Sequence, residues 1–553
     1  MLFESRIMNQ ESLLRPDEHR DFGWASKNQK SRMKNLINTF LHNRWKEIFL
    51  LFFLTTFFIF SLNGIDLTTS DLGRHIKSGE YVFKDSSVLY KNFYSFTEGE
   101  FPFINHHWGT GVVFFLVYKL FSFAGLSVLF ALISCLTFGF FFLVSWKRSN
   151  IAVSVLSSIC AFPLILWRSE VRPEMFSYFF CGIYYLLVWG YFSNKFSRKI
   201  LFFIPVLQII WVNLHSYFFL GYFIIGVYFF YSLINLYLKK QGKEKAISLG
   251  IILFLSIIVS LLNPSGISGL LYPVHIFDNF GYRLLENQNL FFLEKILGSY
   301  PPGVYFRLLF LLIIFSWIWK TVREKKIDVA DLIFTGFFLF IAVKAVRNFS
   351  LFAFFAIPVL SVNLNNFTFS KKNNINNFFY LLIITVIFPL IIVINPNFWT
   401  MRYKFLTGIL KNNSGSADFF LQNNIKGPVF NNYDIGGYLI FYLFPKEKVF
   451  VDNRPEAYPS SFFTDVYIPM QENQDKWNHQ IDKEYKFNVI FFQRNDLTPW
   501  AQQFLVSRIK DVNWAPVFVD NWTIIFLRRN KINNDLITKY ELPNEMFSGN
   551  SNK

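Results

Sequence analysis

Apolar runs of 15–22 residues recur between residues 47 and 394, separated by short polar segments. A helix that crosses the hydrocarbon core of a bilayer needs about 17–25 residues, and lipid forces the backbone to satisfy its own hydrogen bonds. The runs lack the charged faces with a 3.6-residue period that soluble helices carry. The pattern therefore predicts about eleven membrane-spanning helices. We place them at 47–63, 125–146, 151–167, 175–192, 200–214, 216–237, 246–262, 303–319, 328–345, 349–363 and 377–394.

One further apolar segment, Thr110–Phe123, could be counted as a span. It is short, Lys119 interrupts it, and counting it would invert every later loop and place the cationic clusters outside. We interpret it as an amphipathic helix that lies on the outer face of the membrane. The first outer loop then covers residues 64–124.

Basic residues concentrate in alternate loops, which is the positive-inside pattern of cytoplasmic loops. The basic N-terminal arm, residues 1–46, joins this cytoplasmic side and has no apolar core of a cleavable signal peptide. Residues 396–553 fall on the other side, so the C-terminal domain is predicted to be extracytoplasmic, facing the periplasm or the cell exterior. The cationic clusters are 44–46, 147–148, 195–199, 239–245, 320–326 and 371–372.

The C-terminal segment has the short apolar runs of a small α/β domain. Asp520-Asn521 suits a tight hairpin turn, helices are expected around 435–443, 474–485 and 498–510, and residues 531–553 look frayed. The predicted fold class is an all-α polytopic membrane protein, residues 47–395, with a small α/β domain at residues 396–553. The expected strands are Val429–Phe430, Val449–Asp452, Asn488–Phe492, Pro516–Val519 and Thr523–Leu527.

Composition supports a membrane protein and weakens a nucleic-acid role. Hydrophobic residues make up 53% of the chain and charged residues 16%, against about 25% charged in a soluble protein. The net charge of +17 resides in the arm and the short loops, because residues 396–553 hold 18 Lys and Arg against 16 Asp and Glu. The three cysteines lie inside apolar runs, so no disulfide framework is expected in the polar parts.

The first outer loop carries the strongest candidate chemistry. Ser70 is a plausible N-cap of a helix on which Asp71 and His75, four residues apart, share one face. A carboxylate held by a neighbouring His or Arg can act as a general base. Asp66 is a rival carboxylate, and an acidic residue in a first helical turn can also serve the helix dipole alone.

His75, His106, His107 and Asp71 are residue types that zinc or manganese accept. The loop has no H-x-x-x-H, no H-E-x-x-H and no paired D-x-D, so we expect no cofactor and keep a divalent metal as the alternative.

Other polar residues gather in the outer loops, where ionisable groups near lipid carry information. Arginine suits bidentate contact with phosphate, so the loop from Arg168 to Glu174 could clamp an anionic headgroup; a structural salt bridge is the alternative for Arg172. The candidate substrate or phosphate ligands are Arg172, Glu174, Asn213, His215, Lys344 and Arg347.

In the C-terminal domain, Asp452 and Arg454 follow an expected strand and either face the membrane cavity or form a structural ion pair. Asp434-Ile435-Gly436-Gly437 lacks the nucleotide-binding spacings and fits a closely packed helix-entry turn better.

These motifs, in this order, resemble a large, mostly uncharacterised group of bacterial multi-pass membrane proteins. In layout the chain is also similar to GT-C glycosyltransferases such as protein O-mannosyltransferases and aminoarabinose transferases. His107 stands where the bacterial group is expected to carry Glu. The resemblance rests on Asp71, His75 and Gly79; Asn92–Thr97; the helix led by Trp108; Arg172-Pro173; Trp211–His215; Asn263–Gly266; Arg347-Asn348; Val429–Leu439; and Val449–Arg454.

The resemblance implies an enzyme that moves a sugar from a polyprenyl-phosphate donor to a glycan, lipid or protein acceptor at the outer face of the cytoplasmic membrane. Asp71 would deprotonate or steer the acceptor with His75 and His107 beside it, and Arg172 and Arg347 would hold the leaving phosphate. The alternatives are a transporter or flippase of lipid-linked sugars, a sugar-polymer polymerase or ligase, and a non-catalytic envelope scaffold. Membrane lipid is an expected partner and nucleic acid is not.

Overall fold

The computed structural model describes residues 44–240, 242–276, 278–325, 327–366, 380–387, 390 and 405–547. A helix at 44–61 opens the described chain, and a further helical segment covers 380–387, the described part of the predicted span 377–394. The remaining helices of the membrane part are α2 (Leu72–Tyr81), α3 (Trp108–Arg148), α4 (Ile151–Trp167), α5 (Glu174–Phe192), α6 (Phe203–Leu214), α7 (Phe219–Tyr237), α8 (Lys243–Val259), α9 (Gly266–His275), α10 (Leu290–Leu297), α11 (Pro302–Glu324), α12 (Val329–Lys344) and α13 (Phe349–Asn363).

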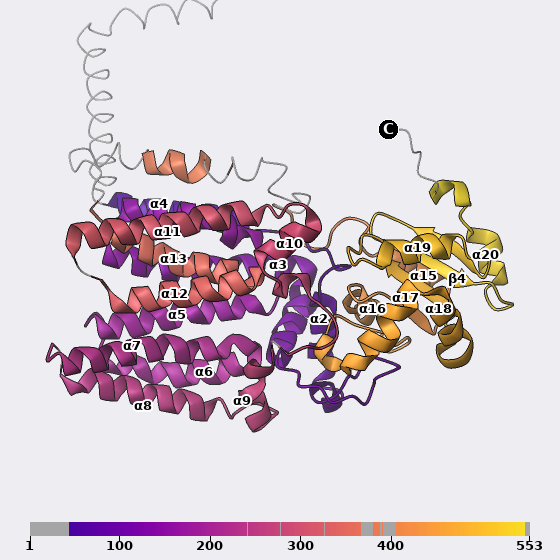
Figure 1. The fold of residues 1–553 in the computed structure, drawn as a ribbon, viewed down its shortest axis with the longest axis horizontal. Coiled ribbons are helices and arrows are strands. Elements are labelled where there is room, and N and C mark those ends of the chain that lie inside the picture. The colour runs from indigo at the N-terminus through magenta and orange to yellow at the C-terminus, as the bar shows by residue number, and fades with distance from the viewer. Residues whose placement is uncertain are drawn as a thin grey trace, which may run out of the picture.

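The long helices run side by side and bury a phenylalanine-rich core (Figure 1). Among the described residues, five helical segments are long and apolar enough to cross a membrane: Trp108–Arg148, Glu174–Phe192, Ser216–Tyr237, Pro302–Glu324 and Val346–Asn363. The helix Ile151–Trp167 is apolar but shorter. The chain is therefore a multi-pass membrane protein by helix length and composition, while the number of eleven spans stays a prediction.

The predicted surface helix at Thr110–Phe123 is the first part of α3. The backbone at Ser122 leaves the helical region (φ 56°, ψ −163°), and this kink separates residues 108–121 from the predicted span 125–146. The first part packs tightly on α2, because a Cβ on Gly79 would lie 1.9 Å from the carbonyl oxygen of Gly111. Only glycine at position 79 permits this approach, which brings α2 against the start of α3.

The C-terminal domain holds a four-stranded sheet with the order β1-β2-β4-β3. Strands β1 and β2 are parallel, and β4 is antiparallel to both β2 and β3. The Asp520-Asn521 turn is confirmed, since Asp520 Oδ1 accepts from the amide N–H groups of Trp522 (2.8 Å) and Thr523 (2.7 Å). The strands are β1 (Val429–Asn431), β2 (Val489–Gln493), β3 (Trp514–Val519) and β4 (Thr523–Arg528).

The sheet and the helices around it lie at one end of the long helices (Figure 1). The expected helices at 435–443, 474–485 and 498–510 are confirmed, whereas the frayed end predicted at 531–553 is wrong at α20, because the Ile537 side chain is buried against the core. The helices are α15 (Gly415–Gln422), α16 (Gly436–Leu443), α17 (Ile468–Glu472), α18 (Gln474–Gln480), α19 (Ala501–Ile509) and α20 (Asn534–Tyr540).

The expected strand Val449–Asp452 does not form. Its backbone hydrogen bonds go elsewhere: Val449 makes a single isolated bridge with Ser95 of the first outer loop, and the Asn431 side chain bonds the backbone at Phe450 and Val451. The apolar pattern was correct about burial, but the segment joins the C-terminal domain to the first loop instead of joining the sheet.

Arg454 strengthens the same junction. Its guanidinium donates to both oxygens of the Asp452 carboxylate (2.7 and 2.6 Å) and to Asn92 Oδ1 in the first loop (2.7 Å). It also lies over the rings of Tyr94 and Phe103, at 5.6 and 4.6 Å from their centroids. A buried, hydrogen-bonded ion pair thus fixes the C-terminal domain on the first loop.

We expect Arg454→Ala to destabilise the protein by about 3–5 kcal/mol, because it leaves the buried Asp452 carboxylate without its cation. Thermal unfolding of purified protein in detergent would measure this. Arg529→Ala is the matched control, since its pair with Glu541 is exposed and such pairs contribute about 0–1 kcal/mol. Equal shifts in melting temperature for Arg454→Ala and Arg529→Ala would contradict the structural role of Arg454.

Candidate active site

Asp71 stands at the entrance to α2, in the N-cap position that the sequence suggested for Ser70. Its carboxylate does not cap the helix. Oδ2 lies 3.1 Å from Nε2 of His75 and 3.4 Å from the Arg74 guanidinium, while Oδ1 is buried with no hydrogen-bond partner among the described residues. The spacing of four residues places the His75 ring over Asp71, as predicted.

The Asp71–His75 pair consists of a carboxylate and a neutral imidazole. Burial alone would raise the pKa of Asp71, but the hydrogen bond from His75 and the nearby charges of Arg172 and Arg74 hold that pKa well below its usual value. Burial and the Arg74 charge lower the pKa of His75 to about 4, despite Asp71. His75 therefore carries its single proton on Nε2 and donates it to Asp71 at neutral pH.

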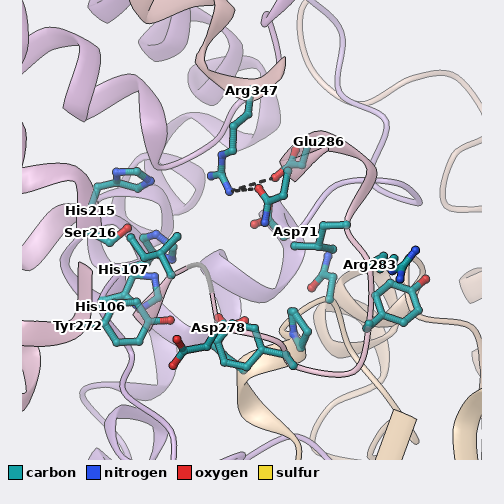
Figure 2. Close-up of a pocket in the computed structure, with 18 of the residues that line it drawn as sticks. Asp71, His106, His107, His215, Ser216, Tyr272, Asp278, Arg283, Glu286 and Arg347 are labelled. Atoms are coloured by element: carbon teal, nitrogen blue, oxygen red, sulfur yellow. Dashed lines mark hydrogen bonds and ion pairs between the residues drawn. The ribbon is translucent and has the colours of Figure 1, made fainter. Parts of the chain in front are cut away.

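Three further histidines extend from this pair. The His107 ring centroid lies 5.3 Å from that of His75, 3.9 Å from that of His106 and 5.0 Å from that of His215. Tyr272 of α9 stacks on His106 at 4.0 Å. Burial lowers the pKa values of His106, His107 and His215, so the rings are neutral at pH 7 (Figure 2).

The hydrogen bonds of His215 fix its tautomer. Its Nδ1 lies 3.2 Å from the backbone N–H of Tyr217, which can only donate, and 2.8 Å from Ser177 Oγ. Ser177 Oγ itself accepts from the indole N–H of Trp211 (2.9 Å), so its own proton points to His215. Nδ1 is therefore an acceptor, and the proton of His215 resides on Nε2, where it is a hydrogen-bond donor.

A cluster of arginines and glutamates from three segments of the chain lies beside Asp71. Arg168 bonds Glu174 and Glu286 (2.9 Å each), and Arg172 bonds Glu170 (2.6 Å) and Glu286 (2.8 Å). Arg347 pairs with Glu174, reaches Glu286 at 3.6 Å and donates to Asn287 (2.9 Å). Three guanidinium groups face three carboxylates, so this set balances its own charge.

Two cavities meet at Asp71. Both are also lined by the segment Tyr282–Leu284, Glu286 and Asn453, so this segment runs between them. The first cavity has a volume of about 300 Å³ and the second about 350 Å³. The first adds Arg74, His106, His107, His215, Tyr217, Tyr272 and Arg347 (Figure 2); the second adds Thr69, Arg172, Tyr433, Asp434, Gln493, Asp496 and Thr498.

The structure brings together several of the predicted site residues. Asp71, His107, His215 and Arg347 line the first cavity, and Arg172 lines the second with Asp71. Sequence reasoning did not single out Glu286, which bonds two arginines from another loop, because a lone carboxylate in a long loop gives no local signal.

Other predicted residues lie behind the cavities. His75 and Glu174 hold Asp71 and Arg347, respectively, and Asn213 accepts the indole N–H of Trp108 (2.9 Å). Lys344 is exposed over the ring of Phe340. Asp452 and Arg454 form the buried ion pair of the domain junction, and their neighbour Asn453 lines both cavities.

Asp434 in the second cavity has an unusual environment. Burial, and then the neighbouring Asp496, raise the pKa of Asp434 to about 7. An acid whose pKa is raised in the folded state costs stability increasingly as pH rises from its unfolded value, near 4, to its folded value.

We therefore expect Asp434→Asn to stabilise the protein, and to do so by about 2 kcal/mol more at pH 8 than at pH 5. Melting temperatures in detergent at the two pH values would show this. A stability difference that does not change with pH would contradict a raised pKa at Asp434.

No family model matches the chain, and no curated protein matches its sequence. Solved structures do match. The apo oligosaccharyltransferase of Archaeoglobus fulgidus is 12% identical, with a TM-score of 0.55 over 88% of this chain and 75% of that chain. The same enzyme tethered to an acceptor peptide containing the NVT sequon is 12% identical, with a TM-score of 0.55 over 89% of this chain and 75% of that chain. Apo ArnT from Cupriavidus metallidurans is 12% identical, with a TM-score of 0.49 over 91% of this chain and 99% of that chain.

The archaeal oligosaccharyltransferase is a GT-C glycosyltransferase, and the predicted resemblance to that class is confirmed for the fold alone. One structure of the archaeal enzyme, 11% identical with a TM-score of 0.51 over 87% of this chain and 73% of that chain, contains zinc and sulfate. Within the described part of this chain, no group of three or more His, Cys, Asp or Glu is arranged to hold a metal ion. The expectation of no cofactor stays a prediction, and so does the divalent metal kept as its alternative.

Proposed function

We propose that this protein is a membrane glycosyltransferase that moves a sugar from a polyprenyl-phosphate donor to an acceptor at the outer face of the cytoplasmic membrane. The observation that carries the proposal is the position of Asp71, which lines two cavities of different chemistry and whose Oδ1 has no hydrogen-bond partner among the described residues. One cavity offers hydrogen-bond donors from Arg347 and His215, and the other is rich in carboxylates. The GT-C fold supports the same reaction class.

In the proposed reaction an acceptor hydroxyl or amide approaches the anomeric carbon while it donates a hydrogen bond to Asp71 Oδ1. The bond between the anomeric carbon and the phosphate oxygen breaks, and the new glycosidic bond forms on the opposite face. Because the pKa of Asp71 is low, this carboxylate is a weak base. It takes the proton only once bond formation has made the acceptor atom acidic.

The polyprenyl phosphate leaves with the bonding electrons and gains negative charge. In the first cavity Arg347 and His215 are the donors that can stabilise this charge. The Nε–H of Arg347 has no hydrogen-bond partner among the described residues, and the tautomer of His215 leaves its proton on Nε2. Arg347 is held in place by Glu174 and Asn287. Preorganised donors of this kind cost no reorganisation during the reaction.

A transporter or flippase of lipid-linked sugars is the second candidate. It needs polar groups along a path across the bilayer. Within the described long helices of the membrane part, the buried charged groups Glu174, Lys320 and Asp331 lie near helix ends, and Asp331 is paired with Arg148 (2.7 Å). Both cavities lie at one end of the bundle, beside the C-terminal domain. This asymmetry favours an enzyme that works at one face.

The test is to incubate purified full-length protein in nanodiscs with radiolabelled polyprenyl-phosphate sugars and candidate acceptors, and to follow the loss of label from the lipid. Release of label by the wild type, and not by Asp71→Asn, is the expected result. Label retained across the panel, together with measurable binding of the lipids, would overturn the proposal in favour of a transporter or scaffold.

A further inference from the structure

Residues that line the second cavity carry buried polar atoms that lack partners within the described part of the chain. Tyr433 Oη and Gln493 Oε1 have no hydrogen bond, although these side chains are only 2% and 5% exposed. Thr498 Oγ1 and Asp71 Oδ1 share this condition, and all four residues line the same cavity. A buried polar group left unsatisfied costs about 1–3 kcal/mol, so such a concentration on one wall indicates a site that a ligand completes.

The backbone around these groups is held firmly. Gln493 ends β2, and its N–H donates to Asn432 Oδ1 (2.9 Å). The Nδ2 of the same Asn432 donates to the Asp496 carboxylate (2.8 Å), which also accepts the N–H of Thr498 (2.8 Å). The N–H of Tyr433 donates to the Tyr467 hydroxyl (2.8 Å). The unpaired groups are therefore preorganised on rigid elements, as in a binding site.

The charge of the cavity restricts its occupant. Four carboxyl groups line it, from Asp71, Glu286, Asp434 and Asp496, against the two guanidinium groups of Arg172 and Arg283. Asp434, whose pKa is raised to about 7, is only partly ionised at neutral pH. Arg172 is already paired with Glu170 and Glu286, and Arg283 is exposed. A phosphate or carboxylate would meet repulsion here, whereas hydroxyl groups can donate to the carboxylates and to Gln493 Oε1 while accepting from Tyr433 and Thr498.

The shape and the aromatic lining fit the same ligand. A volume of about 350 Å³ lies at the lower end of small-ligand pockets. Tyr282 stacks on Tyr433 with 4.2 Å between the ring centroids and closes the cavity with an aromatic side chain from the membrane part. Tyr282 also contacts Phe463 of the C-terminal domain (5.3 Å), so the two parts of the protein build the site jointly.

We propose that the second cavity binds a non-anionic sugar residue of the acceptor through its hydroxyl groups, with Tyr433, Gln493, Thr498 and Asp496 as ligands. The inference rests on the proposed transferase function, in which the bound sugar presents one hydroxyl to Asp71. The acceptor is then a glycan or a glycolipid headgroup, and peptide and anionic acceptors are excluded from this cavity.

Saturation-transfer NMR on the full chain in nanodiscs tests the proposal without any turnover. The probes are the methyl glycosides of glucose and N-acetylglucosamine, glucose 6-phosphate, and an Asn-Val-Thr tripeptide amide. We expect binding of at least one uncharged glycoside and none of the phosphate or the tripeptide. The double variant Tyr433→Phe/Gln493→Leu should bind the glycoside about 5- to 150-fold more weakly, since two hydrogen bonds together contribute about 1–3 kcal/mol.

Controls separate the site from the fold and from the reaction. Tyr433→Phe alone removes only a buried hydroxyl without a partner among the described residues, so the ligand-free variant should melt at the wild-type temperature or above it. Tyr237→Phe, at an exposed position on α7, should bind the glycoside as the wild type does. Asp71→Asn should lose transfer and still bind the glycoside.

Absence of glycoside binding to the wild type, unchanged binding by the double variant, or preference for the phosphate or the tripeptide would each overturn the sugar site. Glycoside binding without any transfer of label would instead leave the site standing and remove the proposed function.

Discussion

Asp71→Asn should reduce sugar transfer by about 10²–10⁴-fold, the contribution typical of a positioned general base. The amide has the shape of the carboxylate, and its oxygen can still accept the Nε2–H of His75, so α2 and the fold should persist. It cannot take a proton from the acceptor or offset the positive charge of Arg74. Initial rates with a radiolabelled polyprenyl-phosphate donor, together with melting temperatures, would separate the loss of chemistry from the loss of structure.

Asp66→Asn is the matched control for this prediction. The Asp66 carboxylate accepts from the backbone and hydroxyl of Thr68 (2.9 and 2.7 Å) and from Asn413 (2.9 Å), through an oxygen that an amide retains. It is not among the residues that line either described cavity. We expect near wild-type transfer from Asp66→Asn. An inactive Asp66→Asn beside an active Asp71→Asn would exchange the roles of the two carboxylates.

Arg347→Ala should reduce transfer by about 10²–10³-fold, because it removes a preorganised donor aimed at the leaving phosphate. Lys344→Ala, three residues earlier on an exposed position, should leave transfer unchanged. The pair is informative because the two cations are close in sequence and differ in location. The measurement is the dependence of initial rate on donor concentration, with folding monitored by size-exclusion chromatography.

Arg347→Ala also leaves Glu174 without one of its two cations, so a folding defect could imitate a catalytic one. Arg347→Lys covers this case, since lysine keeps the charge beside Glu174 but loses the planar fork that binds phosphate in a bidentate manner. We expect Arg347→Lys to fold normally and to remain impaired in transfer. Full activity in Arg347→Lys, or equal losses in Arg347→Ala and Lys344→Ala, would rule out phosphate binding by Arg347.

The candidate site was partly predictable, because some of its contacts join residues close in the sequence and others join residues far apart. Asp71 and His75 are four residues apart on one helix, so their contact follows from helix geometry. The expectation that Arg172, Arg347 and His215 lie at the same face follows from the order of the predicted spans, because each span carries the chain to the opposite side of the membrane. The partners of these residues were not predictable from any local pattern. Glu286 contacts Arg168 and Arg172, which precede it by more than a hundred residues, and Arg347, which follows it by about sixty residues.

The sequence by itself determined the long apolar helices, the helix over Thr110–Phe123 and four of the five expected strands, because lipid and sheet faces impose strong patterns on apolar residues. It also determined that the ionisable groups gather at one face. The tertiary structure alone decided that Val449–Asp452 pairs with the first loop, that Arg454 belongs to a junction and Lys344 to the surface, and that Tyr433 and Gln493 share a cavity with Asp71. These outcomes depend on long-range packing and on which buried polar groups find partners, and no local pattern encodes either.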